Sequence, residues 1–442
     1  MSNRADMHRR VARVRMVVLV GVMAGGGIAG RAAMTRGEPR PAAGPVQAAP
    51  AGGSAIVPFT IHVPDAVLVD LKQRLARARF PDEVELAGWD YGTNLAYLKE
   101  LVTYWRDKYD WRAQERALNQ FEQFKTNIDG LNLHFIHRKS KERNAFPLLI
   151  THGWPGSFVE FTKIIGPLTD PVAYGGRAQD AFDVVIPSIP GYGFSDRPRT
   201  RAYNSTKVAE VEAKLMARLG YTRYGAQGGD VGALIAGPLA VNDAAHVAGI
   251  HLNMCLGGVP PSDVQDPLAM LSTADRERWN ARQAFSAEET GYGTEQGTKP
   301  QTIGAALNDS PVGLAAWIVE KFRTWCDCDG NPETKFTKDE LLTNVMVYWV
   351  TETAASAARI YYENRHAPPG QYSRRVEVPT ACADFLKEPF WTPRPWVETR
   401  FNVTRWTQFP RGGHFAALEQ PDALVRDIRA FFGELRTAPT NR

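Results

Sequence analysis

Near the middle of the chain stands the pentapeptide Gly228-Gly229-Asp230-Val231-Gly232, after a predicted strand at 222–226 and before a predicted helix at 231–240. Small residues on both sides of one larger side chain are typical of a tight strand–turn–helix elbow, in which bulkier residues would clash. Such an elbow would present the Asp230 carboxylate to a pocket and leave the Val231 backbone N–H at the helix start, where negative charge is favoured. The plainer alternative is an Asp that caps the helix.

Short apolar runs rich in β-branched residues lie on both sides of this elbow. They occupy residues 131–137, 148–151, 183–186, 247–252 and 376–380, and helical stretches separate most of them. This alternation predicts an α/β fold, a mostly parallel sheet with helices on both faces. We expect the core to have two parts, a first at 126–256 and a second at 373–442. The intervening stretch 257–372 is helical and rich in Trp and Tyr, and we expect it to be an inserted cap over a site.

The segment 54–125 is predicted to be small, mostly helical and rich in aromatic residues. A helix that begins near residues 93–94 places four apolar side chains at helical spacing on one face: Leu98, Leu101, Val102 and Trp105. We expect this segment to pack around the core and the cap.

Residues 1–36 have the pattern of a secretory signal. Five Arg in the first fifteen residues precede the apolar run 16–30, and small residues follow at 32–33. We therefore expect export, to the periplasm or out of the cell. A membrane anchor formed by residues 16–30 is the alternative, although the run is shorter than the ~20 residues of a spanning helix. Residues 37–53 are rich in Pro, Ala and Gly and are predicted to be a linker.

The composition excludes several classes of protein. The 442 residues are 44% hydrophobic and 23% charged, which matches an ordinary globular protein and excludes a disordered or collagen-like chain. The formal net charge is +4, but residues 1–53 hold eight Arg against two acidic residues, so residues 54–442 carry −2. We therefore expect no nucleic-acid-binding face on the folded part.

The four cysteines, Cys255, Cys326, Cys328 and Cys382, are too few for a disulfide scaffold. Cys326 and Cys328 have no nearby His, which argues against a zinc site. We expect two free thiols in a loop.

The residue types around the elbow indicate covalent catalysis. A carboxylate needs no base to activate it, and it suits attack on a saturated carbon, which argues against a protease or a lipase. The turn 152–155 follows a predicted strand, and there Trp154 would offer a second backbone N–H beside that of Val231. His414 lies on a predicted strand-to-helix loop near the C-terminus and is the candidate base.

An acid is needed to orient this His and to stabilise the imidazolium. Asp384 and Glu388 both follow the predicted strand at 376–380 and precede His414 in the chain. Spacing alone does not choose between them.

The chain resembles the microsomal-type epoxide hydrolases over nearly all of residues 57–435. The resemblance rests on the His152-Gly-Trp-Pro turn, the Asp230 elbow, the Gly412-Gly-His-Phe-Ala-Ala ending and two long motifs at 298–316 and 341–349. It implies an α/β-hydrolase core, an inserted helical cap and the N-terminal segment of that family. It also implies catalysis without a metal or an organic cofactor.

Carried over position by position, the resemblance makes Asp230 the nucleophile and His414 the base. It favours Glu388 over Asp384 as the acid, through the surrounding framework at 378–397, although Leu386 stands where the family usually has Pro.

Two tyrosines of the family's cap bind the epoxide oxygen, and Tyr292 and Tyr361 match their positions. Tyr362 is the neighbouring alternative to Tyr361. A phenol with a pKa of about 10 stays protonated at neutral pH and can give its proton to a forming alkoxide.

The resemblance implies that an epoxide and water are converted to a vicinal diol through a hydroxyalkyl ester on Asp230, in detoxification or secondary metabolism. The expected partners are a small apolar epoxide and water, and the aromatic cap favours a bulky apolar group on that epoxide. Oligomeric state is left open, and membrane contact is expected only if the leader is retained. Two rivals are a haloalkane dehalogenase, which would carry Trp where Val231 stands, and a non-catalytic receptor on a hydrolase scaffold.

Overall fold

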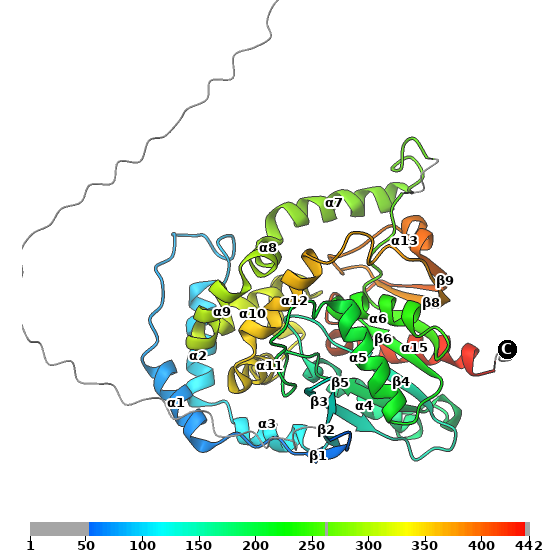
Figure 1. Ribbon diagram of the computed structural model, residues 1–442. Helices are drawn as coiled ribbons and strands as arrows, with labels where there is room; N and C mark the ends of the chain where they lie inside the picture. The colour runs from blue at the N-terminus through cyan, green and yellow to red at the C-terminus, as the bar shows by residue number, and fades with distance from the viewer. Residues whose placement is uncertain (1–52, 261–263, 438–442) are drawn as a thin grey trace, which may run out of the picture. The chain divides into compact units, whose positions relative to one another are not determined.

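The computed structural model describes residues 53–260 and 264–437 of the chain (Figure 1). The predicted leader at 1–36 and all but the last residue of the predicted linker at 37–53 lie outside these residues. No helix within the described ranges combines the length and the apolar composition that a membrane-spanning segment needs.

In the described part of the chain, nine strands form one sheet in the order β1-β2-β3-β5-β4-β6-β7-β8-β9. The strands are β1 (Val57–Phe59), β2 (Gln123–Ile128), β3 (Leu131–Arg138), β4 (Phe146–Thr151), β5 (Phe182–Pro187), β6 (Tyr224–Gly228), β7 (Val247–Leu252), β8 (Val376–Phe385) and β9 (Phe401–Phe409). The pairs from β5 to β9 are parallel, and the pairs among β1, β2, β3 and β5 are antiparallel. The predicted mostly parallel sheet is confirmed, and β6, which leads into the elbow, lies in its centre.

The helices fall into three groups along the chain. The N-terminal group comprises α1 (Asp65–Ala76), α2 (Leu95–Asp107) and α3 (Trp111–Leu118). The core helices are α4 (Thr162–Thr169), α5 (Ser205–Arg218), α6 (Asp230–Asn242), α13 (Arg394–Arg400), α14 (Ala416–Glu419) and α15 (Pro421–Thr437). Between β7 and β8 lie α7 (Thr273–Glu289), α8 (Gly291–Thr298), α9 (Pro300–Asp309), α10 (Pro311–Trp325), α11 (Lys338–Thr351) and α12 (Ala354–Arg365).

Helices cover both faces of the sheet, as the alternation of strands and helices predicts. In the view of Figure 1, α5 and α6 lie in front of the sheet and α15 lies behind it. Helix α5 packs against α6, and α15 packs against α4. The sheet is therefore a buried middle layer, and the carboxyl ends of its parallel strands carry the loops that hold the candidate site.

The N-terminal segment contains strands as well as the predicted helices. Helix α2 begins after Asn94, whose side chain accepts a hydrogen bond from the Tyr97 backbone N–H, and its four predicted apolar residues are buried. Strands β1 and β2 were not predicted, and they extend the sheet at its antiparallel edge. Helices α1 and α2 pack against α10, and α2 and α3 pack against α11. This segment therefore holds the helices inserted after β7 on one side.

The expectation of unpaired cysteines is wrong. Cys255 and Cys382 form one disulfide and Cys326 and Cys328 form another. Cys255 follows β7 and Cys382 lies on β8, and these neighbouring strands bring the two Cα atoms to 5.9 Å, a spacing that suits a disulfide. Residues 127 apart in the sequence are brought together by strand pairing, which composition alone does not reveal.

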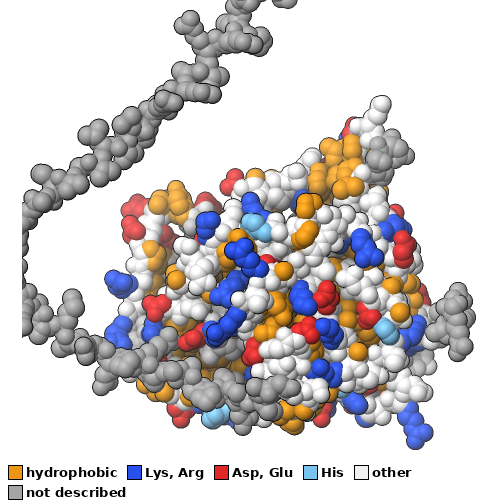
Figure 2. All heavy atoms as spheres, viewed as in Figure 1, with side chains coloured by type: hydrophobic (Ala, Val, Ile, Leu, Met, Phe, Trp, Pro, Cys, Tyr) orange, Lys and Arg blue, Asp and Glu red, His pale blue; other side chains and the backbone are white. Residues whose placement is uncertain are grey.

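Charged side chains of both signs are spread over the face of the molecule shown in Figure 2.

Candidate active site

The Asp230 carboxylate stands on a strained turn between β6 and α6. Asp230 has a φ of 50°, a backbone conformation that L residues other than Gly seldom adopt. Its small neighbours are sterically required. A Cβ on Gly232 would lie 2.0 Å from the carbonyl oxygen of Thr151, and a Cβ on Gly228 would lie 2.5 Å from the Gly232 backbone. The predicted elbow is present, and the strain indicates a functional rather than a capping position.

The loop after β4 donates a hydrogen bond to this carboxylate. The Trp154 backbone N–H lies 2.8 Å from Asp230 Oδ1. Val231 is the second residue of α6, so its backbone N–H has no acceptor within the helix and points out of the helix N-terminus. The two predicted oxyanion donors thus come from the ends of two adjacent strands, β4 and β6.

Helix α11 holds this loop in place. Asn344 donates to the carbonyl oxygen of Pro155 at 2.8 Å, and the Tyr348 hydroxyl donates to that of Gly156 at 2.6 Å. The Ser157 hydroxyl in turn donates to Asn344 Oδ1 at 2.8 Å. The motif at 341–349 therefore acts on the site indirectly, through the backbone that carries the Trp154 N–H.

His414 lies between two carboxylates. Its Nε2 is 3.3 Å from Asp230 Oδ2, and its Nδ1 is 2.9 Å from Glu388 Oε2. Burial lowers the pKa of His414, but the charges of Glu388 and Asp230 outweigh this effect and hold the pKa well above its usual value. Asp384, the alternative acid, instead accepts from Arg278 at 2.7 Å and from Gln408 at 3.3 Å. The geometry therefore favours Glu388.

Tyr292 and Tyr361 line a pocket of about 190 Å³ together with Asp230. The remaining lining is mostly apolar and comprises Val231, Leu234, Met254, Leu256, Asn364 and Phe390. The Tyr292 ring stacks on Trp154 at 5.0 Å between centroids, and the Tyr361 ring lies 5.8 Å from that of Tyr292. Burial and the negative charge of Asp230 raise the pKa of Tyr292 above 10, and burial above all does the same for Tyr361. Both phenols are therefore proton donors at neutral pH.

Tyr362, the alternative to Tyr361, faces elsewhere. Its ring stacks on His366 at 3.9 Å, and it does not line the pocket. Two neighbouring residues of a helix point about 100° apart, so only one of the pair can face Asp230.

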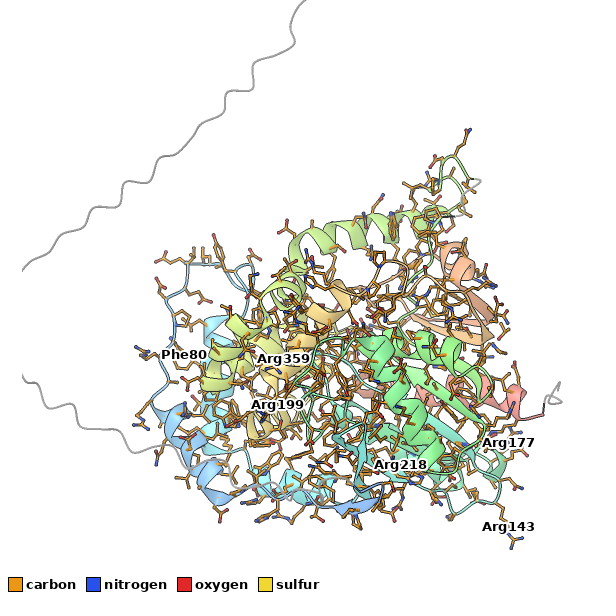
Figure 3. All side chains as sticks on the ribbon, viewed as in Figure 1. Phe80, Arg143, Arg177, Arg199, Arg218 and Arg359 are labelled. Atoms are coloured by element: carbon orange, nitrogen blue, oxygen red, sulfur yellow. A yellow bond between two sulfur atoms is a disulfide. The ribbon has the colours of Figure 1, made fainter. Side chains whose placement is uncertain are left out.

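A larger groove of about 980 Å³ contains none of the predicted site residues. It is lined by charged side chains that include Lys125, Arg199, Arg359 and Glu352; Figure 3 labels Arg199 and Arg359, on the loop after β5 and on α12. Neither the Asp230 carboxylate nor the His414 imidazole lines this groove. The smaller pocket at Asp230 is therefore the candidate site.

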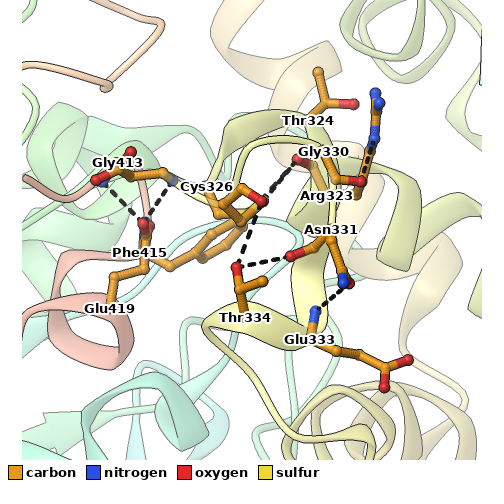
Figure 4. The surroundings of a disulfide bond; sticks show 12 residues. Arg323, Thr324, Cys326, Gly330, Asn331, Glu333, Thr334, Gly413, Phe415 and Glu419 are labelled. Carbon is orange, nitrogen blue, oxygen red and sulfur yellow. Dashed lines mark hydrogen bonds between the residues drawn. A yellow bond between two sulfur atoms is a disulfide. The ribbon is translucent and has the colours of Figure 1, made fainter.

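Sequence reasoning missed the residues that hold the His414 loop. The Glu419 carboxylate accepts from the backbone N–H groups of Gly413 and Phe415 at 3.0 and 2.9 Å (Figure 4). It also accepts from the backbone N–H of Asp327 at 2.7 Å. Burial raises the pKa of Glu419 to about 7, although these three donors oppose the rise. The His414 backbone N–H donates to the carbonyl oxygen of Trp325 at 3.0 Å.

The Cys326–Cys328 disulfide belongs to the same support. It closes the turn that follows α10, with a Cα–Cα distance of 5.2 Å, and that turn carries Asp327 (Figure 4). Asp327 accepts from the Gly412 backbone N–H at 2.9 Å. No group of His, Cys, Asp or Glu in the described ranges has the arrangement of a metal site.

Two family models match the chain, "Epoxide hydrolase N terminus" over residues 56–161 and "alpha/beta hydrolase fold" over residues 147–390. Epoxide hydrolase 1 of Oryctolagus cuniculus is 41% identical over 409 residues, which cover 86% of this chain and 89% of the relative. The crystal structure of juvenile hormone epoxide hydrolase from the silkworm Bombyx mori is similar with a TM-score of 0.81 at 33% identity, covering 87% of this chain and 95% of that one. The Aspergillus niger epoxide hydrolase has a TM-score of 0.78 at 33% identity, covering 86% and 97%. The chain therefore belongs to the microsomal-type epoxide hydrolase family and is an epoxide hydrolase with the α/β-hydrolase fold.

Proposed function

We propose that the chain opens an apolar epoxide to a vicinal diol through a covalent ester on Asp230. In the first step Asp230 attacks a ring carbon, the carbon–oxygen bond of the ring breaks, and Tyr292 and Tyr361 donate hydrogen bonds and a proton to the departing oxygen. Both phenols keep their protons at neutral pH, as hydrogen-bond donation to that oxygen requires.

In the second step a water molecule attacks the carbonyl carbon of the ester. His414 takes one proton from that water, and Glu388 orients and stabilises the imidazolium. The N–H groups of Trp154 and Val231 hold the oxyanion, a contribution of about 3–4 kcal/mol per donor in comparable sites. The diol then leaves with the proton from His414, the carboxyl group of Asp230 loses its proton to solvent, and the phenolate formed in the first step takes one proton back.

One observation carries this proposal. Asp230 accepts a hydrogen bond from the Trp154 N–H on one oxygen and lies 3.3 Å from His414 Nε2 on the other, beside a pocket lined by two phenols. A carboxylate in that setting can attack carbon, and the imidazole can then activate water.

The shape of the pocket supports a proposal for the substrate class. A volume of about 190 Å³ with a mostly apolar lining suits an epoxide whose apolar group is about the size of a phenyl ring. A panel of styrene-type, terpene-type and fatty-acid epoxides would test this, and we expect the styrene type to have the highest kcat/KM.

The dehalogenase and receptor alternatives are not favoured. Val231 stands where a dehalogenase would carry its halide-binding Trp, and two phenols beside the carboxylate have no task in releasing a halide. A receptor would not need the imidazole held between two carboxylates.

Two variants test the covalent route. We expect Asp230→Ala to remain folded and to have no turnover. We expect His414→Gln to form the ester and fail to hydrolyse it, so that intact-protein mass spectrometry finds a gain equal to one substrate. Turnover by Asp230→Ala near that of the parent would contradict the mechanism.

We propose, separately, that the protein is exported, with membrane anchoring by residues 16–30 as the alternative. The signal-like residues 1–36 support export, and so do two disulfides, which persist in oxidising compartments. Fractionation of cells that express the full chain would test this; recovery of the protein with an intact leader in the cytoplasmic fraction would contradict it.

A further inference from the structure

The Asp230 carboxyl group borders a second cavity besides the apolar pocket. This cavity measures about 10 Å³, and its walls include Glu160, Asn253, His414 and Asp230. Its volume is at the lower limit of the space that one water molecule needs. The Asp230 carboxyl group therefore lines both the apolar pocket and this small polar cavity. The epoxide reaches it from the apolar pocket, and a single water molecule can reach it from the polar cavity.

The Glu160 carboxyl group is a half-buried acid without a structural task. Glu160 lies in the 3₁₀ turn Phe158–Phe161, directly after the loop that carries the Trp154 N–H. Within residues 53–260 and 264–437, no protein group forms a hydrogen bond or an ion pair with this carboxyl group. Burial raises the pKa of Glu160 to about 8, with His414 opposing the rise and Asp230 adding to it.

Two acids that are more deeply buried than Glu160 have protein partners. Glu212 accepts from the Thr151 hydroxyl at 3.0 and 3.1 Å, and Glu419 accepts from three backbone N–H groups. Burial of a carboxyl group without such partners costs free energy. The position of Glu160 is therefore explained by the cavity it faces and not by packing.

Gly156 has no side chain, and the Glu160 carboxyl group occupies the space where one would lie. A Cβ on Gly156 would lie 1.2 Å from Glu160 Oε1, so any other residue at position 156 would displace the acid. Asn253 completes the polar wall. Its Oδ1 accepts from Gln227 at 2.7 Å, which turns its NH₂ group towards Gly229 and the cavity.

We propose that Glu160 positions the water molecule that hydrolyses the Asp230 ester. Glu160 accepts a hydrogen bond from one O–H of this water while the other O–H faces His414 Nε2. Both the protonated and the ionised carboxyl group can act as this acceptor. The inference rests on the proposed function, because it assigns a task within the second step of that mechanism.

Hydrolysis of the Asp230 ester has two stages, the attack of water and the release of the diol. The water oxygen forms a bond to Cγ of Asp230, and His414 Nε2 takes one proton. The tetrahedral intermediate then collapses, the bond from Cγ to the alkyl oxygen breaks, and the proton on His414 passes to the departing diol. The hydrogen shared with Glu160 stays on the new carboxyl oxygen until solvent removes it. Glu160 neither gives nor takes a proton in this step.

Single-turnover kinetics with styrene oxide separate the two steps. Acid-quenched samples are weighed by intact-protein mass spectrometry, which follows formation and loss of the ester. We expect Glu160→Leu to form the ester within about threefold of the parent rate. It should hydrolyse the ester about 10- to 100-fold more slowly, because the attacking water molecule is no longer oriented. Its Tm should stay close to that of the parent, because the Glu160 carboxyl group has no protein partner that the change would remove.

Three further variants make the test specific. Glu160→Gln keeps an acceptor oxygen and should hydrolyse the ester faster than Glu160→Leu. Gly156→Ala, which displaces the acid, should slow the same step, and combining it with Glu160→Leu should add little. Glu212→Gln is the control for the raised pKa, since burial also raises the pKa of Glu212 to about 8, and it should leave the partition between the steps unchanged.

Hydrolysis of the ester by Glu160→Leu at the parent rate would overturn the proposal. Equal slowing of both steps would also overturn it, because that outcome indicates a general disturbance of the site. If neither these variants nor His414→Gln ever gains mass on Asp230, the covalent mechanism itself fails, and the role of Glu160 fails with it.

Discussion

Gly153→Ala is the change with the most direct steric effect on the nucleophile. A Cβ at position 153 would lie 2.1 Å from Asp230 Oδ1 and 2.6 Å from Asp230 Cγ. Ordinary contacts between such atoms are about 3.5 Å, so the carboxylate must move by about 1 Å. A displacement of that size costs about 100-fold in kcat, or about 2.7 kcal/mol of activation free energy. Overpacking of the site should also cost about 1–3 kcal/mol of stability.

The assay is steady-state hydrolysis of styrene oxide, with Tm measured in parallel so that kcat is compared well below unfolding. Gly433→Ala in α15 is the control, because no atom lies within 4 Å of its added Cβ and Ala favours the helix. It should keep the parent kcat. A folded Gly153→Ala with kcat within twofold of the parent would refute the steric argument.

Three other changes have calculable effects. Glu388→Gln should lower kcat by about 10²- to 10⁴-fold, whereas Asp384→Asn, which loses the contact with Arg278, should keep most of it; equal losses would show that the acid is misassigned. Burial raises the pKa of Glu212 from 4.5 to about 8, so the native state holds more protons than the unfolded state between pH 4.5 and pH 8. The protein therefore loses stability as pH rises through this range, by about 4–5 kcal/mol in all. Urea unfolding of the parent and of Glu212→Gln at pH 5 and pH 9 checks this, and parallel pH dependences would contradict it. Removing the Cys255–Cys382 disulfide by a double Cys→Ala change should cost about 4–5 kcal/mol, because it spans 127 residues, and removing Cys326–Cys328 only about 1–2 kcal/mol. Urea midpoints of the two double variants decide the order.

The elbow could be predicted because its requirements are local. A tight turn restricts five consecutive residues, and the sequence pattern shows that restriction directly. The acid could not be chosen from spacing because β8 continues to Phe385, five residues beyond the predicted end at Thr380. Asp384 is therefore still in the strand, where its register partner is Gln408, whereas Glu388 lies in the loop that follows and reaches His414.

The support of the His414 loop could not be predicted for a different reason. Glu419 and Asp327 lie 92 residues apart, and their contact depends on how the helices inserted after β7 pack on the core. Neither residue belongs to a local pattern. The same holds for Glu160, whose position beside His414 and Asp230 becomes visible only when the strands are assembled.

The Cys255–Cys382 disulfide spans six helices of the described part of the chain, α7 to α12, which lie between β7 and β8. Residues 256–381 therefore form a covalent ring that contains both pocket tyrosines and the turn behind His414. A protease that cuts this ring once leaves two fragments still joined through sulfur, so the nicked enzyme would migrate as two bands only after reduction. Substrate-contacting helices can thus survive a break in their own backbone without separating from the sheet that carries the nucleophile.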